Sequence, residues 1–178
     1  MVLPEQRPRL TNEEVMARCP WATFGKLKHR GPNIVTSLEL DPAEMEKRNI
    51  HLQQKYAEIE EKEVRYEEIH CDDAEYLIVA FGSCARIAQK AMEEARAEGI
   101  KVGLLRPITL WPFPSKAIAE RSRQVKGILT VELNAGQMVE DVRLAVECKV
   151  PVEYYGRLGG IVPDPDEVVT ALKEKIIK

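Results

Sequence analysis

The chain has 178 residues, of which 44% are hydrophobic and 31% charged, an ordinary composition for a globular protein with one domain of common size and an additional segment. Its 26 basic and 29 acidic side chains give a formal net charge of −3, which is too balanced for a nucleic-acid-binding surface. No stretch approaches the roughly 20 apolar residues of a membrane-spanning helix, and the first ten residues lack a signal-peptide pattern. These features predict a cytoplasmic protein that binds neither nucleic acid nor membrane.

The four cysteines lie far apart in the sequence, at positions 19, 71, 84 and 148. Zinc sites and iron–sulfur sites use cysteines that are separated by only a few residues, and no such spacing occurs here. A framework of disulfides is also not expected in a chain of this size without a secretory signal. The sequence therefore predicts neither a bound metal nor a disulfide.

Residues 1–41 are expected to form an irregular leader. Prolines interrupt regular structure at positions 4, 8, 20 and 32. Two large aromatic residues, Trp21 and Phe24, precede a basic group at residues 26–30. A loop of this length is uncommon inside a compact domain. The leader is either a linker or a docking arm, which packs on its own domain, on a second copy or on another surface of an assembly.

Residues 42–63 are predicted to form an acidic surface helix. Asp41 can cap this helix, and Pro42 fits the first helical position, where its missing N–H is no loss. A narrow apolar stripe follows the helical period at Met45, Leu52, Tyr56 and Ile59. The other positions are mostly charged, as expected of a helix that lies on a surface.

Residues 64–178 are predicted to form an α/β domain because short apolar runs alternate with helical patterns. The strands are expected at 76–81, 102–105, 128–133 and 152–155, and the helices at 83–98, 114–124, 137–147 and 164–177. Asp164, Pro165 and Glu167 give the last helix a clear start. The fourfold alternation predicts a three-layer α/β/α fold with a mostly parallel sheet, and residues 65–70 could add an antiparallel edge strand.

Ligands of such sheets bind at the carboxyl ends of the strands, but the loops there lack the usual catalytic motifs. The first loop, 81–86, has one glycine, whereas a dinucleotide site needs several, and no phosphate-binding Gly-Lys-Ser or Gly-Lys-Thr occurs. Ser83 lacks the flanking glycines of a nucleophile elbow and is interpreted as a helix N-cap. Cys84 is interpreted as a buried, inert residue rather than a reactive thiol. The sequence therefore predicts no catalytic, cofactor-binding or metal-binding residue.

Four polar residues at these loops form a candidate partner-facing rim: Ser83, Arg86, Asn134 and Gln137. Arg86 lies in the first helical turn, where a cation opposes the helix dipole by roughly 0.3–1 kcal/mol, so an acidic group should compensate it. That group is either a neighbouring Glu or Asp or an external anion or partner carboxylate. The alternative for Asn134 is that its side chain caps a turn and does not face a partner.

Four stretches in order resemble the second domain of the alpha chain in 2-oxoacid:ferredoxin oxidoreductases. They are Asp73–Ser83, Gly103–Pro114, Glu132–Arg143 and Tyr155–Pro163. The stretch Pro32–Leu38 and the helix after it are most similar to the 2-ketoisovalerate and 2-oxoglutarate types. The resemblance covers roughly residues 20 to 177, and it implies a fold like the C-terminal domain of transketolase.

This resemblance implies a function that the composition could not show. The full enzymes oxidatively decarboxylate a 2-oxoacid with coenzyme A, and use thiamine diphosphate, magnesium and iron–sulfur clusters to reduce ferredoxin. The chain is then expected to be a non-catalytic assembly domain, either a short alpha chain or a fragment. Its partners would be a thiamine-binding domain or subunit and other oxidoreductase subunits. Association with a second copy of the chain, as a homo-oligomer, is a further alternative. The alternative is a free-standing ligand-binding α/β domain that uses the strand ends.

Overall fold

The computed structural model describes residues 10–21, 31 and 36–177. Phe24, the basic group at 26–30 and most of the stretch Pro32–Leu38 lie outside the described residues. The chain divides into two units, Met1–Arg48 and Asn49–Lys178, which are considered separately. Among the described helices, none combines the length and the apolar character that crossing a membrane requires.

The first unit contains a short helix, α1 (Asn12–Arg18), which the prediction of an irregular leader missed. Thr11 caps this helix by accepting a hydrogen bond from the backbone N–H of Glu14, while the Glu14 carboxylate accepts one from the backbone N–H of Thr11. This reciprocal pair is a capping box, and its Thr-x-x-Glu pattern was already visible in the sequence. The prediction was therefore wrong for residues 12–18.

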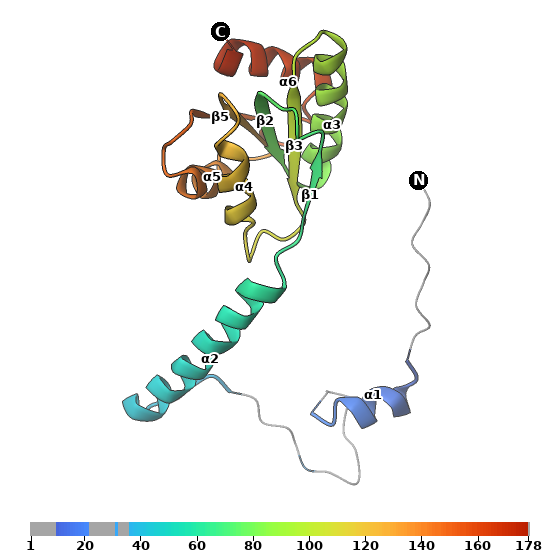
Figure 1. The fold of residues 1–178 in the computed structure, drawn as a ribbon. Coiled ribbons are helices and arrows are strands. Elements are labelled where there is room, and N and C mark those ends of the chain that lie inside the picture. Colours follow the sequence, from blue (N-terminus) through green and yellow to red (C-terminus); the bar gives the residue numbers. More distant parts are fainter. Residues whose placement is uncertain (1–9, 22–30, 32–35, 178) are drawn as a thin grey trace. The chain divides into compact units, whose positions relative to one another are not determined.

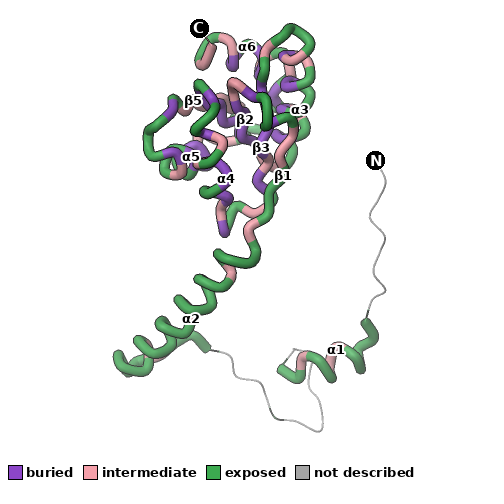
Figure 2. Tube along the Cα trace, in the orientation of Figure 1, coloured by how far each residue is buried: buried purple, intermediate pink, exposed green. Residues whose placement is uncertain are grey.

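The acidic helix α2 spans Pro42–Lys62 and begins as predicted. The Asp41 carboxylate accepts hydrogen bonds from the backbone N–H groups of Ala43 and Glu44, at 2.8 and 3.2 Å. None of the 21 residues of α2, all of which the structure describes, is fully buried, as Figure 2 shows along its length. Its last turns belong to the second unit, where Tyr56 contacts Trp111 edge to face with ring centroids 5.6 Å apart.

The second unit has a five-stranded sheet with the strand order β1-β3-β2-β4-β5 (Figure 1). The strands are β1 (Tyr66–Ile69), β2 (Tyr76–Ala80), β3 (Val102–Pro107), β4 (Ile128–Glu132) and β5 (Val152–Gly156). Strand β1 pairs antiparallel with β3 at the edge, and the other pairs are all parallel. The mostly parallel sheet and the antiparallel edge strand are both confirmed, and β2 and β4 are internal as their continuous apolar sequences predict.

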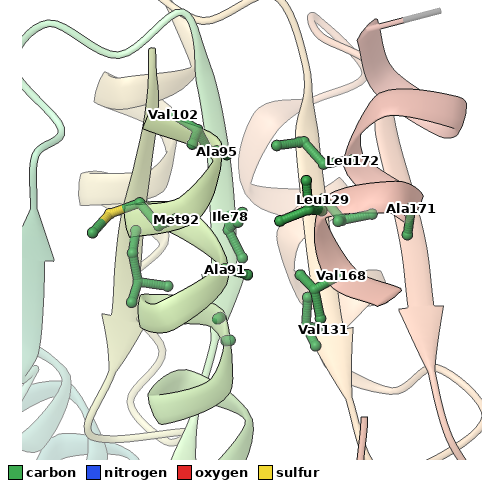
Figure 3. Packing of buried hydrophobic residues seen from close by; sticks show 14 of the residues in the cluster. Ile78, Ala91, Met92, Ala95, Val102, Leu129, Val131, Val168, Ala171 and Leu172 are labelled. Carbon is green, nitrogen blue, oxygen red and sulfur yellow. The ribbon is translucent and has the colours of Figure 1, made fainter. Parts of the chain in front are cut away.

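Two helices cover one face of the sheet, α3 (Gly82–Ala97) and α6 (Pro165–Leu172), and α6 continues as a π-helical turn, Lys173–Ile177. Small alanines let α3 approach the strands closely, so that Ala88, Ala91 and Ala95 are fully buried. Figure 3 shows Leu129 and Val131 of β4 on the side of α6. Each fully buried aliphatic side chain of this kind stabilises the fold by roughly 1.5–3 kcal/mol.

The other face is covered by α4 (Ser115–Ser122) and α5 (Met138–Val146). Leu77 and Val79 of β2 point to this face, whereas Ile78 and Ala80 point to the other, as the alternation of a strand requires. The structure therefore has the predicted three layers, with helices on both faces (Figure 1). Every parallel strand ends at the same edge, which is called the carboxyl edge below.

Candidate functional site

The exit of β4 is organised by Glu132, the last residue of that strand. Its side chain is fully buried, and its carboxylate faces the start of α5. One carboxylate oxygen, Oε2, accepts hydrogen bonds from the backbone N–H groups of Gln137 at 3.2 Å and Met138 at 2.8 Å, and the other, Oε1, accepts one from Val139 at 3.0 Å. Glu132 thus satisfies N–H groups at the start of α5 that have no partner within the helix.

Asn134 belongs to the same network. The side-chain nitrogen of Asn134 donates a hydrogen bond to the Glu132 carboxylate at 3.1 Å, and its side-chain oxygen Oδ1 accepts one from the backbone N–H of Gly136 at 2.7 Å. The hydroxyl of Tyr154 on β5 donates to the backbone carbonyl of Asn134. The alternative interpretation that Asn134 caps a turn is therefore confirmed, and it fixes a loop that ends with the exposed Gln137.

The exit of β2 differs from the prediction at Ser83. Helix α3 begins at Gly82, and its N-cap is Phe81, which provides no side-chain hydrogen bond. Gly82 adopts a positive φ of 56°, which glycine reaches without steric cost, so the chain turns directly from strand to helix. The prediction that Ser83 is the N-cap was wrong, and Ser83 is instead an exposed residue of the first turn.

Helix α3 begins at Gly82, so the exposed Arg86 is its fifth residue and lies just past the first turn, in which it was predicted to lie; that first turn holds no acidic residue. No ion pair joins its guanidinium to any residue in the part of the chain that the structure describes. The expected neighbouring Glu or Asp is thus not present among those residues.

Cys84 is buried, as predicted. Burial raises the pKa of its thiol, and the nearby carboxylate of Glu132 raises it further. A thiol must lose its proton to act as a nucleophile, so this environment opposes reactivity. The influence of Glu132 also shows that the first turn of α3 and the exit of β4 are neighbours at the carboxyl edge.

The exit of β3 is attached to the segment that follows α2. The backbone N–H groups of Ile108 and Thr109 donate to the carbonyl of Arg65, at 2.9 and 3.1 Å. The Thr109 hydroxyl donates to the carbonyl of Pro112 at 2.8 Å and accepts from the backbone N–H of Arg65 at 3.0 Å. These bonds fix the loop while leaving Trp111 54% exposed.

The exit of β5 is held by the capping box of α6. Glu167 accepts a hydrogen bond of 2.8 Å from the hydroxyl of Tyr155, and Arg157 lies 3.3 Å from its other oxygen. Burial, followed by the hydrogen bond to Glu167, raises the pKa of Tyr155 to about 12. The backbone N–H of Arg157 donates to the carbonyl of Glu132 at 3.3 Å, so the exits of β4 and β5 are joined directly.

The polar side chains buried at the carboxyl edge mainly hold its loops in place. Within residues 10–21, 31 and 36–177, no group of three or more His, Cys, Asp or Glu side chains could hold a metal ion. The buried Glu132 is occupied by four donors, and the thiol of Cys84 is covered. Sequence reasoning missed Glu132, although a glutamate that ends a continuous apolar strand was a usable signal.

Comparison with known proteins agrees with this picture. Residues 74–168, more than half of the chain, match the family described as pyruvate:ferredoxin oxidoreductase core domain II. The ketoisovalerate oxidoreductase subunit VorB of Methanothermobacter thermautotrophicus is 49% identical over 154 residues, which cover 86% of this chain and 43% of that protein. The 2-oxoglutarate synthase subunit KorA of Methanothermobacter marburgensis is 33% identical over 101 residues, 57% of this chain and 27% of that protein. The chain thus spans less than half the length of these relatives.

Two solved structures share the fold. The 2-oxoglutarate:ferredoxin oxidoreductase from Magnetococcus marinus aligns with a TM-score of 0.66 and 25% identity over 76% of this chain and 24% of that one. A split-gene transketolase aligns with a TM-score of 0.55 and 22% identity over 62% of this chain and 40% of that one, which shows similarity of fold alone. The predicted likeness to 2-oxoacid:ferredoxin oxidoreductases and to transketolase is confirmed. The chain belongs to the family of pyruvate:ferredoxin oxidoreductase core domain II.

Proposed function

We propose that this chain is a non-catalytic assembly domain of a 2-oxoacid:ferredoxin oxidoreductase that converts a 2-oxoacid such as 2-ketoisovalerate to its acyl-CoA. The similarity to VorB carries the proposal, because it extends over 86% of the chain at 49% identity. The carboxyl edge supports it, since its buried polar groups hold loops in place instead of facing an open site. The domain would thus provide surfaces that contact other domains or subunits, and other parts of the enzyme would provide the catalytic groups.

The cofactors of such an enzyme belong to the other parts of the proposed complex. Thiamine diphosphate with magnesium, iron–sulfur clusters and coenzyme A would be held there. The described residues offer no group of three suitable ligands for a cluster or a magnesium ion. The proposed partners are a thiamine-binding domain or subunit and further oxidoreductase subunits, with ferredoxin reached through the complex.

The polar rim of Ser83, Arg86, Asn134 and Gln137 is proposed to face one of these partners. Its side chains lie at the exits of two neighbouring strands, β2 and β4. Arg86 supports this proposal most strongly, because it is an exposed cation near the start of α3 and forms no ion pair with a described residue. The exposed amide of Gln137 supplies hydrogen-bonding groups at the exit of β4, where the Asn134 amide holds the loop.

The leader, residues 1–41, is proposed to be a docking arm that lies on another surface of the assembly. Large aromatic residues such as Trp21 and Phe24 act as anchors when they are docked. Limited proteolysis tests this role, and trypsin should cut first near Lys26–Arg30 and leave the α/β domain intact. Resistance there in a monomeric sample, together with unfolding when residues 1–41 are deleted, would make the leader part of the domain core.

The assembly role is tested with the purified chain alone. We expect no 2-ketoisovalerate-dependent reduction of an electron acceptor, and no rise in melting temperature with coenzyme A or 2-ketoisovalerate. A ligand present at 100 times its dissociation constant would stabilise a binding domain by about 2.7 kcal/mol, so a real site would be visible. A clear shift would favour the alternative of a free-standing ligand-binding domain, and turnover would show an independent enzyme.

A further inference from the structure

Exposed apolar side chains gather at the carboxyl edge of the sheet. The loops that leave β3, β4 and β5 carry seven large hydrophobic residues with exposed fractions between 44% and 62%. These are Ile108, Leu110, Trp111, Leu133, Leu158, Ile161 and Val162. They come from loops that are separate in sequence but lie at the same edge of the sheet, and they are called the exit-loop surface below.

The opposite edge of the sheet has a different character. Its loops, at residues 70–75, 98–101, 123–127 and 147–151, are all described, and none of them holds an exposed large hydrophobic residue. Instead, apart from Arg123, their Lys, Arg, Asp and Glu side chains pair with one another or with nearby helices. Lys126 lies 2.5 Å from Glu75, Arg96 lies 2.6 Å from Asp73, and Lys149 pairs with Glu147. This edge is thus a neutralised surface that is compatible with water.

The residues of the exit-loop surface can form one patch. Neighbouring strands lie about 4.8 Å apart, so the exits of β3 and β5, separated by β2 and β4, fall within about 15 Å. The bond from Arg157 to the carbonyl of Glu132 draws two of these exits together. Single exposed hydrophobic residues are common on proteins, but a contiguous patch marks a site of interaction. The contrast between the two edges therefore requires an explanation beyond chance exposure.

We infer that the exit-loop surface is the docking site of a second folded domain of the same oxidoreductase, one with an apolar face and a carboxylate that meets Arg86. The occupant is the part of the enzyme's polypeptide that lies outside the stretch matched here, since that stretch is only 43% of VorB. Arg86 supplies the charge complementarity, because it lies near the start of α3 at the same edge of the sheet and forms no ion pair with a described residue. The inference rests on the proposed function and adds the surface and the chemistry of its partner.

The test uses a chimera of VorB from Methanothermobacter thermautotrophicus in which the matched residues are replaced by the aligned stretch of this chain. It is produced together with the other subunits of that enzyme. A photo-crosslinking amino acid replaces Ile161 in one version and Leu144 in another. Leu144 is the matched control because it is apolar and 76% exposed but lies on α5, outside the exit loops. We expect crosslinks from position 161 to residues outside the grafted stretch, and none from position 144.

A charge reversal tests the predicted carboxylate. In the version with the crosslinker at position 161, Arg86→Glu should reduce the crosslink yield by about tenfold, because like charges then oppose docking. Arg123→Glu is the control, since Arg123 is an exposed arginine at the opposite edge that also has no ion pair with a described residue. It should leave the yield unchanged. Equal effects of the two reversals would overturn the role of Arg86.

The outcomes separate the inference from the proposed function. If the unmodified chimera does not join the other subunits, the proposed function fails and the inference falls with it. If the chimera assembles but position 161 crosslinks to a second copy of the grafted domain, or crosslinks no better than position 144, only the inference is overturned. A partner contact made from position 161 alone, and weakened by Arg86→Glu, supports both.

Discussion

The carboxylate of Glu132, at the end of β4, accepts a hydrogen bond of 3.0 Å from the backbone N–H of Val139 in the first turn of α5. Together with its other three donors, this bond makes one buried carboxylate the organiser of the exit of β4. The loop that bears Asn134 and Gln137 depends on it. The shape of the carboxyl edge is therefore set by a residue that is itself inaccessible to a partner.

Replacing Glu132 should destabilise the domain. In Glu132→Gln, an amide N–H₂ takes the place of one accepting oxygen and faces N–H donors, so buried groups lose their partner. Hydrogen bonds to charged groups contribute about 1.5–3 kcal/mol each, and a loss of about that size is expected in urea unfolding. Glu140→Gln, an exposed change in the helix α5 that Glu132 caps, should have little effect. Equal midpoints for both variants would contradict this account of Glu132.

The pair of Arg96 and Asp73 predicts a dependence of stability on pH. The hydrogen bonds from Arg96, at 2.6 and 3.1 Å, lower the pKa of Asp73 below its ordinary value. A carboxylate whose pKa is depressed in the folded state stabilises the fold above its unfolded pKa of about 3.9, and this contribution is lost as the pH falls through the folded pKa. Asp73→Asn should thus lower stability at pH 6, and its difference from the natural chain should vanish in stronger acid. A difference that persists unchanged at pH 2 would be inconsistent with the ion pair.

The cysteines should differ widely in reactivity. Burial raises the pKa of Cys71 to about 11, and Cys84 is also buried with a raised pKa, whereas Cys148 is exposed. Only thiolates react quickly with disulfide reagents, so Cys148 should be labelled first at pH 8. Labelling of Cys71 and Cys84 should require unfolding, which peptide mapping by mass spectrometry would show. Fast labelling of Cys84 in the native protein would mean that the start of α3 opens readily.

The sequence predicted the layers of the fold because its signals were local and consistent. Continuous apolar runs marked β2 and β4, and Asp164 with Glu167 marked the start of α6. The missed features depended on tertiary contacts. Ser83 was mistaken for a cap because nothing in the sequence showed that Gly82 would turn the chain one residue earlier. Predicting that Arg86 forms no ion pair with a described residue also required knowing which acidic residues lie near α3.

The candidate site was predicted only in its polar half. Asn134 and Gln137 were recognised from their amides, whereas no role was predicted for the apolar residues of the exit loops, such as Trp111 and Ile161. Whether a hydrophobic residue belongs to the core or contacts a partner depends on its exposure to solvent, and that exposure is known only from the fold. The contrast between the two edges of the sheet could therefore not be predicted from the sequence.

The most direct measurement of the central claim is the activity of the VorB chimera in its complex, followed as 2-ketoisovalerate-dependent reduction of an electron acceptor with coenzyme A. The necessary control is VorB without the exchanged stretch. If this chain is an assembly domain of a 2-oxoacid oxidoreductase, the chimera should restore activity that the truncated control lacks, although the grafted domain contributes no catalytic group. A chimera that is folded but neither joins the other subunits nor restores activity would contradict the account.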